Sequence, residues 1–296
     1  MFQEIYVIDE QEKLTEELKT VFEKHQNLKF KTISTNDLDT VLENPPQLII
    51  INDASKDSTL EKIKKYDDPR ITVICNEKNR GLGAVRNIGI ERATGEYIVH
   101  LDGDDALYEE TTLQKINDLI GEDKPDIVYL GFKDVGGFNK THLSTAENST
   151  KEARLTCDAN FSVPSKCWRR EFLIENNIKF KENIYYEDMV YSTTATILAK
   201  THKYGEFPTF KYYRNRKGSI MSTPSIRRCS DMYRMLAYLM DLYDITPDEY
   251  KPYLLSFIEN ETESLPLRVE AILKCLREGG GTPVFPKRNY KFKGDK

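Results

Sequence analysis

Residues 79–105 constrain the fold of this 296-residue chain more than any other stretch. A turn with two glycines opens a predicted helix over 82–93, and a glycine separates that helix from a predicted apolar strand over 97–101. The strand runs directly into an acidic turn that holds Asp102 and Asp104. Side chains two positions apart on an extended segment leave the same face, so these carboxylates form a pair. Such a pair can bind a divalent cation whose other ligands are a diphosphate and water.

Strands and helices alternate along the first 135 residues, which predicts a mostly parallel sheet covered by helices. Hydrophobic periodicity places strands over 5–9, 29–34, 47–52, 71–75, 97–101 and 126–132. The same criterion places helices over 11–25, 37–43, 59–66, 82–93 and 110–120. Ser58 and Glu61 have the spacing of a capping box, so we expect them to open the helix that starts at residue 59.

The pattern is less regular after residue 135. Residues 136–155 are rich in Thr, Asn and Ser, which favours a surface loop or flap. Helical periodicity returns from Arg227 and predicts helices over 227–242, 253–259 and 267–277. Residues 279–296 begin with three glycines in a row and predict a tail with little structure of its own.

Composition excludes several classes of protein. The net charge is −5 and the basic residues are dispersed, which argues against a nucleic-acid partner. No apolar run approaches the roughly 20 residues of a membrane span, and no signal peptide is evident, so we expect a cytoplasmic protein. The five cysteines lack Cys-x-x-Cys spacing and are expected to be reduced thiols, neither a disulfide framework nor a zinc site.

Four stretches of sequence resemble, in the same order, the motifs of one enzyme family. The first is Ile-Asn-Asp-Ala-Ser-Lys-Asp-Ser at 51–58, and the second is 79–105, which covers the family's Asn-x-Gly, Ala-Arg-Asn and Asp-x-Asp-Asp signatures and has Val-Arg-Asn at 85–87. The third, over 166–188, begins Lys-Cys-Trp-Arg-Arg-Glu-Phe-Leu and ends in the pair Glu-Asp. The fourth is Tyr-Tyr-Arg-Asn-Arg-Lys-Gly-Ser-Ile-Met at 212–221. Through these motifs, residues 47–225 resemble the family 2 glycosyltransferases.

The resemblance implies an inverting enzyme of GT-A fold that uses a nucleotide sugar. This fold is α/β and Rossmann-like, with a mostly parallel mixed sheet flanked by helices. We therefore predict a GT-A catalytic domain over 1–225, a C-terminal helical extension over 226–278 that packs on it, and a flexible tail over 279–296 that is dispensable for folding.

The N-terminus departs from the family pattern. Members usually begin with an apolar strand ending in Pro-x-Tyr-Asn, whose backbone helps to seat the nucleotide base. Here the first strand ends in Val-Ile-Asp-Glu at 7–10, and an additional strand and helix precede residue 47. Either 5–9 or 29–34 can take the place of the family's first strand, which makes 1–46 an atypical segment.

Six residues are candidates for binding the donor: Asp53, Arg86, Asp102, Asp104, Arg216 and Ser219. Asp53 follows an apolar strand, where ligands bind in open α/β sheets. The resemblance implies that Asp53 accepts a hydrogen bond from uracil, and a turn or helix-capping aspartate is the alternative. Arg86 lies in the first turns of a predicted helix, where a guanidinium and a helix N-terminus together favour a diphosphate. A plain surface arginine is the alternative for Arg86.

The acidic turn is the candidate metal site. We expect Asp104 to contact Mn²⁺ or Mg²⁺ directly, with Asp102 nearer to the ribose or to a metal-bound water. A solvated acidic turn is the alternative. Arg216 and Ser219, in the fourth motif, are expected to close over the diphosphate.

The acceptor side depends on the pair Glu187-Asp188. The resemblance implies that Asp188 is the base that takes a proton from the acceptor hydroxyl, with Glu187 beside the acceptor. An aspartate with an ordinary pKa of about 3.9 is ionised at neutral pH and needs no tuning for this role. Adjacent acids at a helix start are also common partners of the helix dipole. Trp168 suits an acceptor-sugar platform, and a core position is the alternative.

These assignments predict an inverting transfer from a nucleotide-diphosphate donor, a UDP-sugar for preference, to a hydroxyl of a saccharide acceptor. Family members often build capsule, lipopolysaccharide or exopolysaccharide chains, and a lipid-linked acceptor would bring the enzyme to the inner face of the membrane. One alternative is a non-catalytic nucleotide-sugar-binding or scaffold module of a polysaccharide-assembly complex. Another is a phospho-receiver domain, because Asp9-Glu10 and Asp53 mimic its acidic pocket. No lysine follows the strand over 97–101, and the chain is too long for a receiver.

Overall fold

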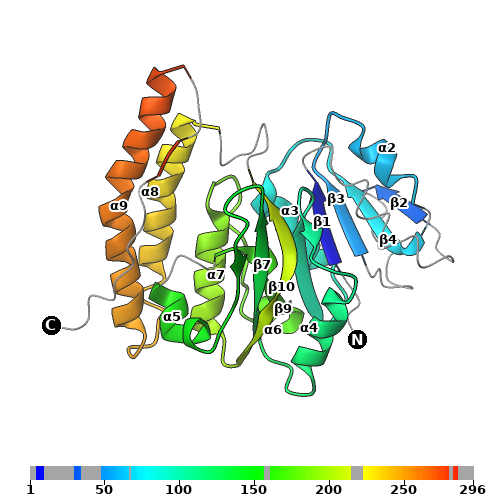
Figure 1. The fold of residues 1–296 in the computed structure, drawn as a ribbon, viewed down its shortest axis with the longest axis horizontal. Helices are drawn as coiled ribbons and strands as arrows, with labels where there is room; N and C mark the ends of the chain where they lie inside the picture. Colours follow the sequence, from blue (N-terminus) through cyan, green and yellow to red (C-terminus); the bar gives the residue numbers. More distant parts are fainter. Residues whose placement is uncertain are drawn as a thin grey trace. The chain divides into compact units, whose positions relative to one another are not determined.

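A computed structural model describes residues 5–9, 30–34, 48–66, 68–156, 161–214, 223–279 and 283–285 (Figure 1). The helices predicted over 11–25 and 37–43 lie outside these residues. The chain forms two compact units. The sheet unit comprises Met1–Ser144, Val163–Asn183 and Lys200–Tyr213, and the helical unit comprises Thr145–Ser162, Ile184–Ala199 and Arg214–Lys296.

The sheet unit is built on a mixed sheet with the strand order β2-β4-β3-β1-β5-β9-β7-β10-β6, to which β8 adds by pairing with β7. The strands are β1 Ile5–Asp9, β2 Phe30–Ser34, β3 Leu48–Asn52, β4 Asp68–Cys75, β5 Tyr97–Asp102, β6 Ala106–Leu107, β7 Ile127–Val135, β8 Thr141–His142, β9 Lys166–Arg169 and β10 His202–Tyr213. The strands from β2 to β5 pair in parallel, as do β7 and β10, whereas β9 is antiparallel to both β5 and β7. The prediction of a mostly parallel mixed sheet is confirmed.

The N-terminal strands occupy distinct places in this sheet. β1 lies between β3 and β5, with Ile8 opposite both Ile51 and Asp102, whereas β2 pairs with β4 at the edge. The place beside the central strands therefore belongs to residues 5–9, and not to the segment over 30–34.

The core of the sheet unit follows from its apolar strands. All five residues of β3 are buried, because a central parallel strand is covered on both faces. The helices of this unit are α2 Thr59–Ile63, α3 Leu82–Arg92, α4 Thr112–Ile120 and α6 Arg170–Glu175. Ile116 and Ile120 of α4 pack against Val128 of β7 in one of its apolar clusters.

The capping box predicted for α2 is wrong. The side chain of Ser58 makes no capping hydrogen bond. Instead, Oδ1 of Asp57 accepts the backbone N–H of Thr59 at 3.0 Å. Hydrogen bonding from Thr59 also holds the pKa of Asp57 below its ordinary value. The capping hydrogen bond thus comes from Asp57, one residue before Ser58. In addition, α2 ends at Ile63 and does not extend to Tyr66 as predicted.

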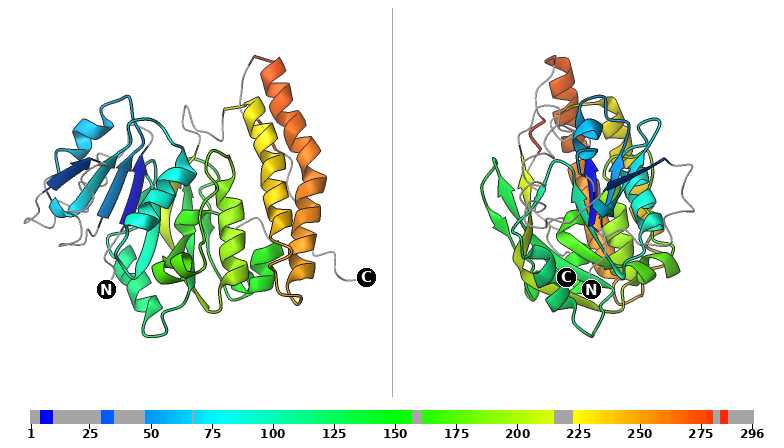
Figure 2. Two further views of the ribbon diagram at one scale, coloured as in Figure 1. Left: turned by 180° about the vertical axis from the view of Figure 1, so that it is seen from behind. Right: turned by 90° about the vertical axis from the view of Figure 1, so that its right-hand side faces the viewer.

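The helical unit contains α5 Lys151–Thr156, α7 Glu187–Leu198, α8 Ile226–Asp241 and α9 Lys251–Arg277. Figures 1 and 2 show α8 and α9 running side by side. Their apolar faces share a core cluster with the other two helices, which includes Leu155, Val190, Met232, Leu239, Phe257 and Ile272. Whether residues 226–278 also pack on a catalytic domain over 1–225 stays a prediction.

Two expectations in this part of the chain are corrected. Residues 136–155 are not simply a surface flap, because they contain β8 and most of α5, and Arg154 and Leu155 are buried. The polar composition misled because Arg154 donates to the Ser149 hydroxyl at 2.9 Å inside the unit. In addition, the two helices predicted after residue 252 are one helix, α9, which continues through Pro266. Within the described residues, no helix combines the length and apolar character that a bilayer span needs.

Candidate functional site

The candidate site of the sheet unit begins where its central parallel strands end. Asn52 at the end of β3 lies opposite Cys75 at the end of β4, and β5 ends at Asp102 on the other side of β1. Asp53, Asn76 and Asp102 therefore gather at one edge of the sheet. Ligands bind at this edge in open α/β sheets.

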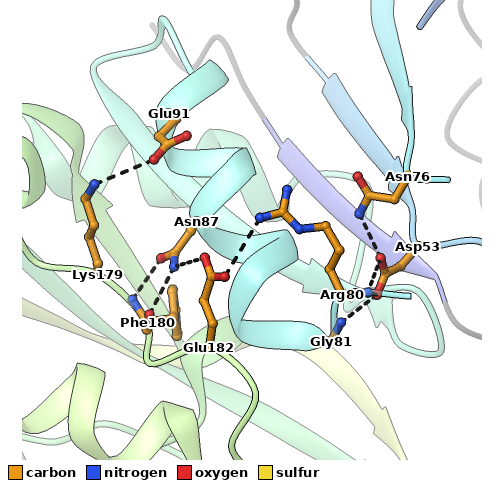
Figure 3. Close-up of polar contacts among 9 residues, drawn as sticks. All are labelled: Asp53, Asn76, Arg80, Gly81, Asn87, Glu91, Lys179, Phe180 and Glu182. Atoms are coloured by element: carbon orange, nitrogen blue, oxygen red, sulfur yellow. Dashed lines mark hydrogen bonds and ion pairs between the residues drawn. The ribbon is translucent and has the colours of Figure 1, made fainter. Parts of the chain in front are cut away.

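Asp53 anchors the loop that leads into α3 (Figure 3). Only 3% of Asp53 is exposed. Its Oδ1 accepts Asn76 Nδ2 at 2.7 Å and the Arg80 N–H at 2.9 Å, while its Oδ2 accepts the N–H groups of Arg80 and Gly81 at 3.0 and 2.9 Å. Both oxygens are engaged by the protein, which matches the turn and helix-start alternative. Recognition of uracil by Asp53 stays a prediction.

Gly81 is the N-cap of α3 and has φ 83°. This left-handed conformation costs a glycine little, whereas a side chain would be strained there. The glycine turn singled out in the sequence thus lets the backbone present two successive N–H groups to the Asp53 carboxylate.

Arg86 is buried and not a surface residue, so the alternative considered for it is wrong. Its side chain is 3% exposed, and Nη2 donates to Oδ1 of Asp102 at 2.9 Å. The guanidinium also lies over the ring of Phe180, 5.4 Å from its centroid. A charge-assisted bond of this kind holds Asp102 in one orientation at the end of β5. Contact between Arg86 and a diphosphate stays a prediction.

His100 was not identified from the sequence, although it shares a strand face with Asp102 at a spacing of two residues. It is 1% exposed, and its ring packs edge-on against the ring of Phe180, with 5.9 Å between the two centroids. Burial lowers the pKa of His100 well below its ordinary value, and the positive charge of Arg86 acts in the same direction. The imidazole is therefore neutral at neutral pH, so it adds no positive charge beside Arg86.

The three carboxylates of the acidic turn differ in their surroundings. The Asp105 N–H closes the turn on the Asp102 carbonyl at 2.9 Å, and Asp105 Oδ1 accepts the N–H of Tyr213 at the end of β10. Asp102 and Asp104 are partly exposed. Among the described residues, no group of three or more His, Cys, Asp or Glu side chains is placed to hold a metal ion. The two carboxylates fit Mn²⁺ or Mg²⁺ only with further oxygen ligands from a bound substrate.

Asn87 extends the network to a segment that the sequence did not assign to the site (Figure 3). Its amide accepts the Phe180 N–H at 2.8 Å and donates to the Phe180 carbonyl at 3.0 Å and to Glu182 at 3.2 Å. Glu182 in turn lies 3.8 Å from the guanidinium of Arg80. Of the neighbouring residues Arg86 and Asn87, the first thus contacts β5 and the second contacts residues 180–182.

Trp168 belongs to the core, so its assignment as an acceptor platform is wrong. It is 0% exposed and lies in β9, opposite Ile98 of β5 on one side and Ile127 of β7 on the other. The physical reason is its strand position, because a central strand covered on both faces leaves no ring surface for a ligand.

Glu187 and Asp188 open α7 in the helical unit. Glu187 is 7% exposed, whereas Asp188 is partly exposed and its Oδ1 accepts the Met189 N–H at 2.9 Å. This first-turn position suits the helix-dipole alternative as well as an accessible base. Arg216 and Ser219 lie outside the described residues.

Known proteins resemble this chain in sequence. The family model described as Glycosyl transferase family 2 matches residues 36–176. The cholesterol galactosyltransferase of Borreliella burgdorferi is 30% identical over 236 residues, which cover 71% of this chain and 64% of that protein. The uncharacterized glycosyltransferase YibD of Escherichia coli is 29% identical over 182 residues, 56% of this chain and 52% of that protein. The chain thus spans less than two thirds of the length of these relatives.

The fold of this chain is similar to those of several solved structures. Staphylococcus aureus TarS 1–349 in complex with UDP-GlcNAc matches with a TM-score of 0.60 at 18% identity, covering 100% of this chain and 98% of that one. The mannosyltransferase PcManGT from Pyrobaculum calidifontis, in complex with GDP-Man and Mn²⁺, matches with a TM-score of 0.52 at 15% identity, covering 95% and 76%. At these identities the likeness establishes the fold alone.

Proposed function

We propose that this chain is a glycosyltransferase of family 2, which is supported by the match of that family's model to residues 36–176 and by the GT-A fold of its α/β sheet. It transfers a sugar from a nucleotide-diphosphate donor to a hydroxyl of a saccharide acceptor. The observation that carries the proposal is the acidic turn after β5, whose Asp102 is oriented by the buried Arg86. The donor we propose is a UDP-sugar of hexosyl or N-acetylhexosaminyl type, which is supported by TarS with UDP-GlcNAc and by the galactosyltransferase relative.

The acidic turn prepares the site for the leaving diphosphate. A bound Mn²⁺ or Mg²⁺, held by Asp104 and Asp102 together with diphosphate oxygens, would neutralise the charge that develops on the leaving group. Arg86 fixes the orientation of Asp102, and Asp105 ties the turn to β10. Carboxylates held in advance would keep a bound cation in place, so that the leaving group is stabilised without reorganisation during the reaction.

The base we propose is Asp188. Its carboxylate takes the proton of the acceptor hydroxyl while that oxygen bonds to the anomeric carbon. The bond from the anomeric carbon to the diphosphate oxygen breaks on the opposite face, so the anomer is inverted. Asp188 is partly exposed at the start of α7, whereas Glu187 is buried, which favours Asp188 over its neighbour for proton transfer.

The acceptor we propose is a growing polysaccharide, free or lipid-linked, handled in the cytoplasm or at the inner face of the membrane. Support comes from two relatives whose names refer to the synthesis or modification of polymers. TarS is described as a poly(ribitol-phosphate) β-N-acetylglucosaminyltransferase and is 26% identical over 194 residues. ExoO of Rhizobium meliloti is described as a succinoglycan biosynthesis protein and is 28% identical over 188 residues. The non-catalytic scaffold alternative predicts binding without turnover of the donor.

Binding and hydrolysis of UDP-sugars test this proposal. Calorimetry with UDP should show heat in Mn²⁺ that largely disappears in EDTA, and slow donor hydrolysis should require the metal. Asp104→Asn should reproduce the EDTA result while the protein melts like wild type. The matched control is Asp118→Asn on the surface of α4, where the exposed hydrogen bond that Asp118 Oδ1 accepts from Gln114 can also be accepted by an amide oxygen.

Each outcome of this experiment is informative. UDP binding of equal strength with and without metal would remove the metal from the proposal. Metal-dependent binding with no turnover of any UDP-sugar would favour the scaffold alternative.

A further inference from the structure

The residue before the Glu187-Asp188 pair has a strained backbone. Tyr186 is the N-cap of α7 and adopts the left-handed conformation, with φ 69° and ψ 26°. A bulky aromatic residue rarely takes this conformation, because its Cβ crowds the backbone. Such strain costs about 1–3 kcal/mol and persists only where surrounding contacts hold it. The contacts that hold Tyr186 come from the two C-terminal helices of the helical unit.

Two buried arginines contact the side chain of Tyr186. Arg228 of α8, 1% exposed, donates from Nε and Nη2 to the Tyr186 hydroxyl at 3.3 and 3.2 Å. Arg268 of α9, 2% exposed, lies over the Tyr186 ring with its guanidinium carbon 5.4 Å from the centroid. Hydroxyl and ring are therefore each fixed by a different helix.

The preceding residue is held by α8 as well. The N–H of Tyr185 donates to Oδ2 of Asp231 at 3.0 Å, and Asp231 is 1% exposed. Arg227 lies over the Tyr185 ring at 5.4 Å and forms an ion pair with Asp231 at 3.5 Å. The backbone entering α7 is thus fixed at two successive residues.

A segment after α9 completes the arrangement. The ring of Phe285 lies 5.5 Å from the guanidinium of Arg228 and 5.7 Å from that of Arg268. Arg268 is also paired with the buried Glu261 at 2.9 Å. Phe285 falls in the tail predicted over 279–296, and its packing against the core cluster shows that this part of the tail is not structureless.

We propose that Arg228 and Arg268 are positioning residues, which act through Tyr186 to aim the Asp188 carboxylate at the acceptor hydroxyl. This inference rests on the proposed function. The direction of the Asp188 side chain is set by the first turn of α7, and the left-handed Tyr186 sets how the chain enters that turn. Displacement of a catalytic group by about 1 Å can cost roughly 100-fold in rate, so the grip on Tyr186 matters for transfer more than for donor binding.

A double-mutant cycle tests whether Tyr186 acts through Asp188. Asp188→Asn alone should lower transfer by roughly 10²–10⁴-fold. Tyr186→Phe keeps the ring but loses the hydroxyl that Arg228 holds, and should lower kcat for transfer by about tenfold with UDP affinity unchanged. Added to Asp188→Asn, Tyr186→Phe should have no further effect, because the group it aims is already absent. Arg228→Lys should repeat the pattern, and it serves if Tyr186→Phe folds poorly.

The matched control is Tyr233→Phe, which removes a hydroxyl from a side chain on α8 that is 55% exposed. It should leave the transfer rate unchanged in both backgrounds. The number of UDP sites per chain, measured by calorimetry, separates a misaligned base from a smaller folded fraction.

The outcomes separate this inference from the proposed function. If Tyr186→Phe and Arg228→Lys lower the rate by the same factor with and without Asp188, these residues do not act through Asp188. The positioning role is then wrong, while the proposed function stands. If Asp188→Asn transfers normally, the assignment of the base is wrong and the positioning role fails with it.

Discussion

Two helices of this protein each follow an N-cap residue with a positive φ, and different contacts hold that residue in place. Before α3 in the sheet unit, the buried Asp53 accepts the N–H groups of Arg80 and Gly81, and the residue with positive φ is Gly81, whose ψ is 160°. Before α7 in the helical unit, the buried Asp231 accepts the N–H of Tyr185, and the left-handed residue is Tyr186.

The difference lies in what holds the residue with positive φ in place. Glycine adopts a positive φ without steric cost, so the turn before α3 is encoded by its own sequence. Tyrosine does not, so the turn before α7 depends on Arg228 and Arg268, which come from distant helices. The first turn should therefore be sensitive to changes nearby, and the second to changes far along the chain.

The largest effect should come from breaking the distant support. Arg268→Leu removes the cation paired with Glu261, which is 2% exposed, and loss of one partner of a buried pair costs roughly 3–5 kcal/mol. Helical circular dichroism during urea unfolding measures this cost. The double change Arg268→Leu with Glu261→Leu should recover much of the stability, since replacing both charges by apolar groups is often neutral.

Arg277→Leu is the matched control for that experiment. Arg277 pairs with Glu270 on the surface of α9 and is 65% exposed, so its loss should cost no more than about 1 kcal/mol. Equal costs for Arg268→Leu and Arg277→Leu would show that the buried pair does not support the turn before α7.

An intermediate effect is expected at the local anchor. Asp53→Asn removes the charge that accepts the loop N–H groups and should destabilise the sheet unit by roughly 2–3 kcal/mol. The only tryptophan of the chain, Trp168, is fully buried in β9, so its fluorescence reports unfolding of this unit. A variant with wild-type stability and weakened UDP binding would instead support recognition of the base by Asp53.

The smallest effect concerns pH. Burial lowers the pKa of His100 in the folded state, so the unfolded chain binds the proton first as the pH falls below about 6.5. Protonation of the unfolded chain should therefore cost the sheet unit about 1 kcal/mol of stability between pH 7.5 and 5.5. In His100→Leu this component should vanish, which urea unfolding followed by Trp168 fluorescence at both pH values can measure. The same loss in variant and wild type would place the responsible proton on another group.

Much of the sheet unit could be predicted from the sequence because its signals are local. Hydrophobic runs and glycine turns located β3, β5 and α3 to within a few residues. Asp53 and Asp102 were found as candidates because parallel strands end at one edge of a sheet. The capping of α2 failed for an equally local reason, since Asp57 and Ser58 are both competent caps and only backbone geometry chooses between them.

The sequence by itself determined the alternation of strands and helices, the glycine turn before α3 and the acidic turn after β5, because each depends on residues that are neighbours along the chain. The tertiary structure alone decided that Arg86 pairs with Asp102, that Trp168 is core, and that Phe285 packs on two arginines. These contacts join residues far apart in sequence, and no local pattern encodes which partner a buried charge or ring will meet. The conformation of Tyr186 belongs to this second group, since its strain persists only through packing that the whole helical unit supplies.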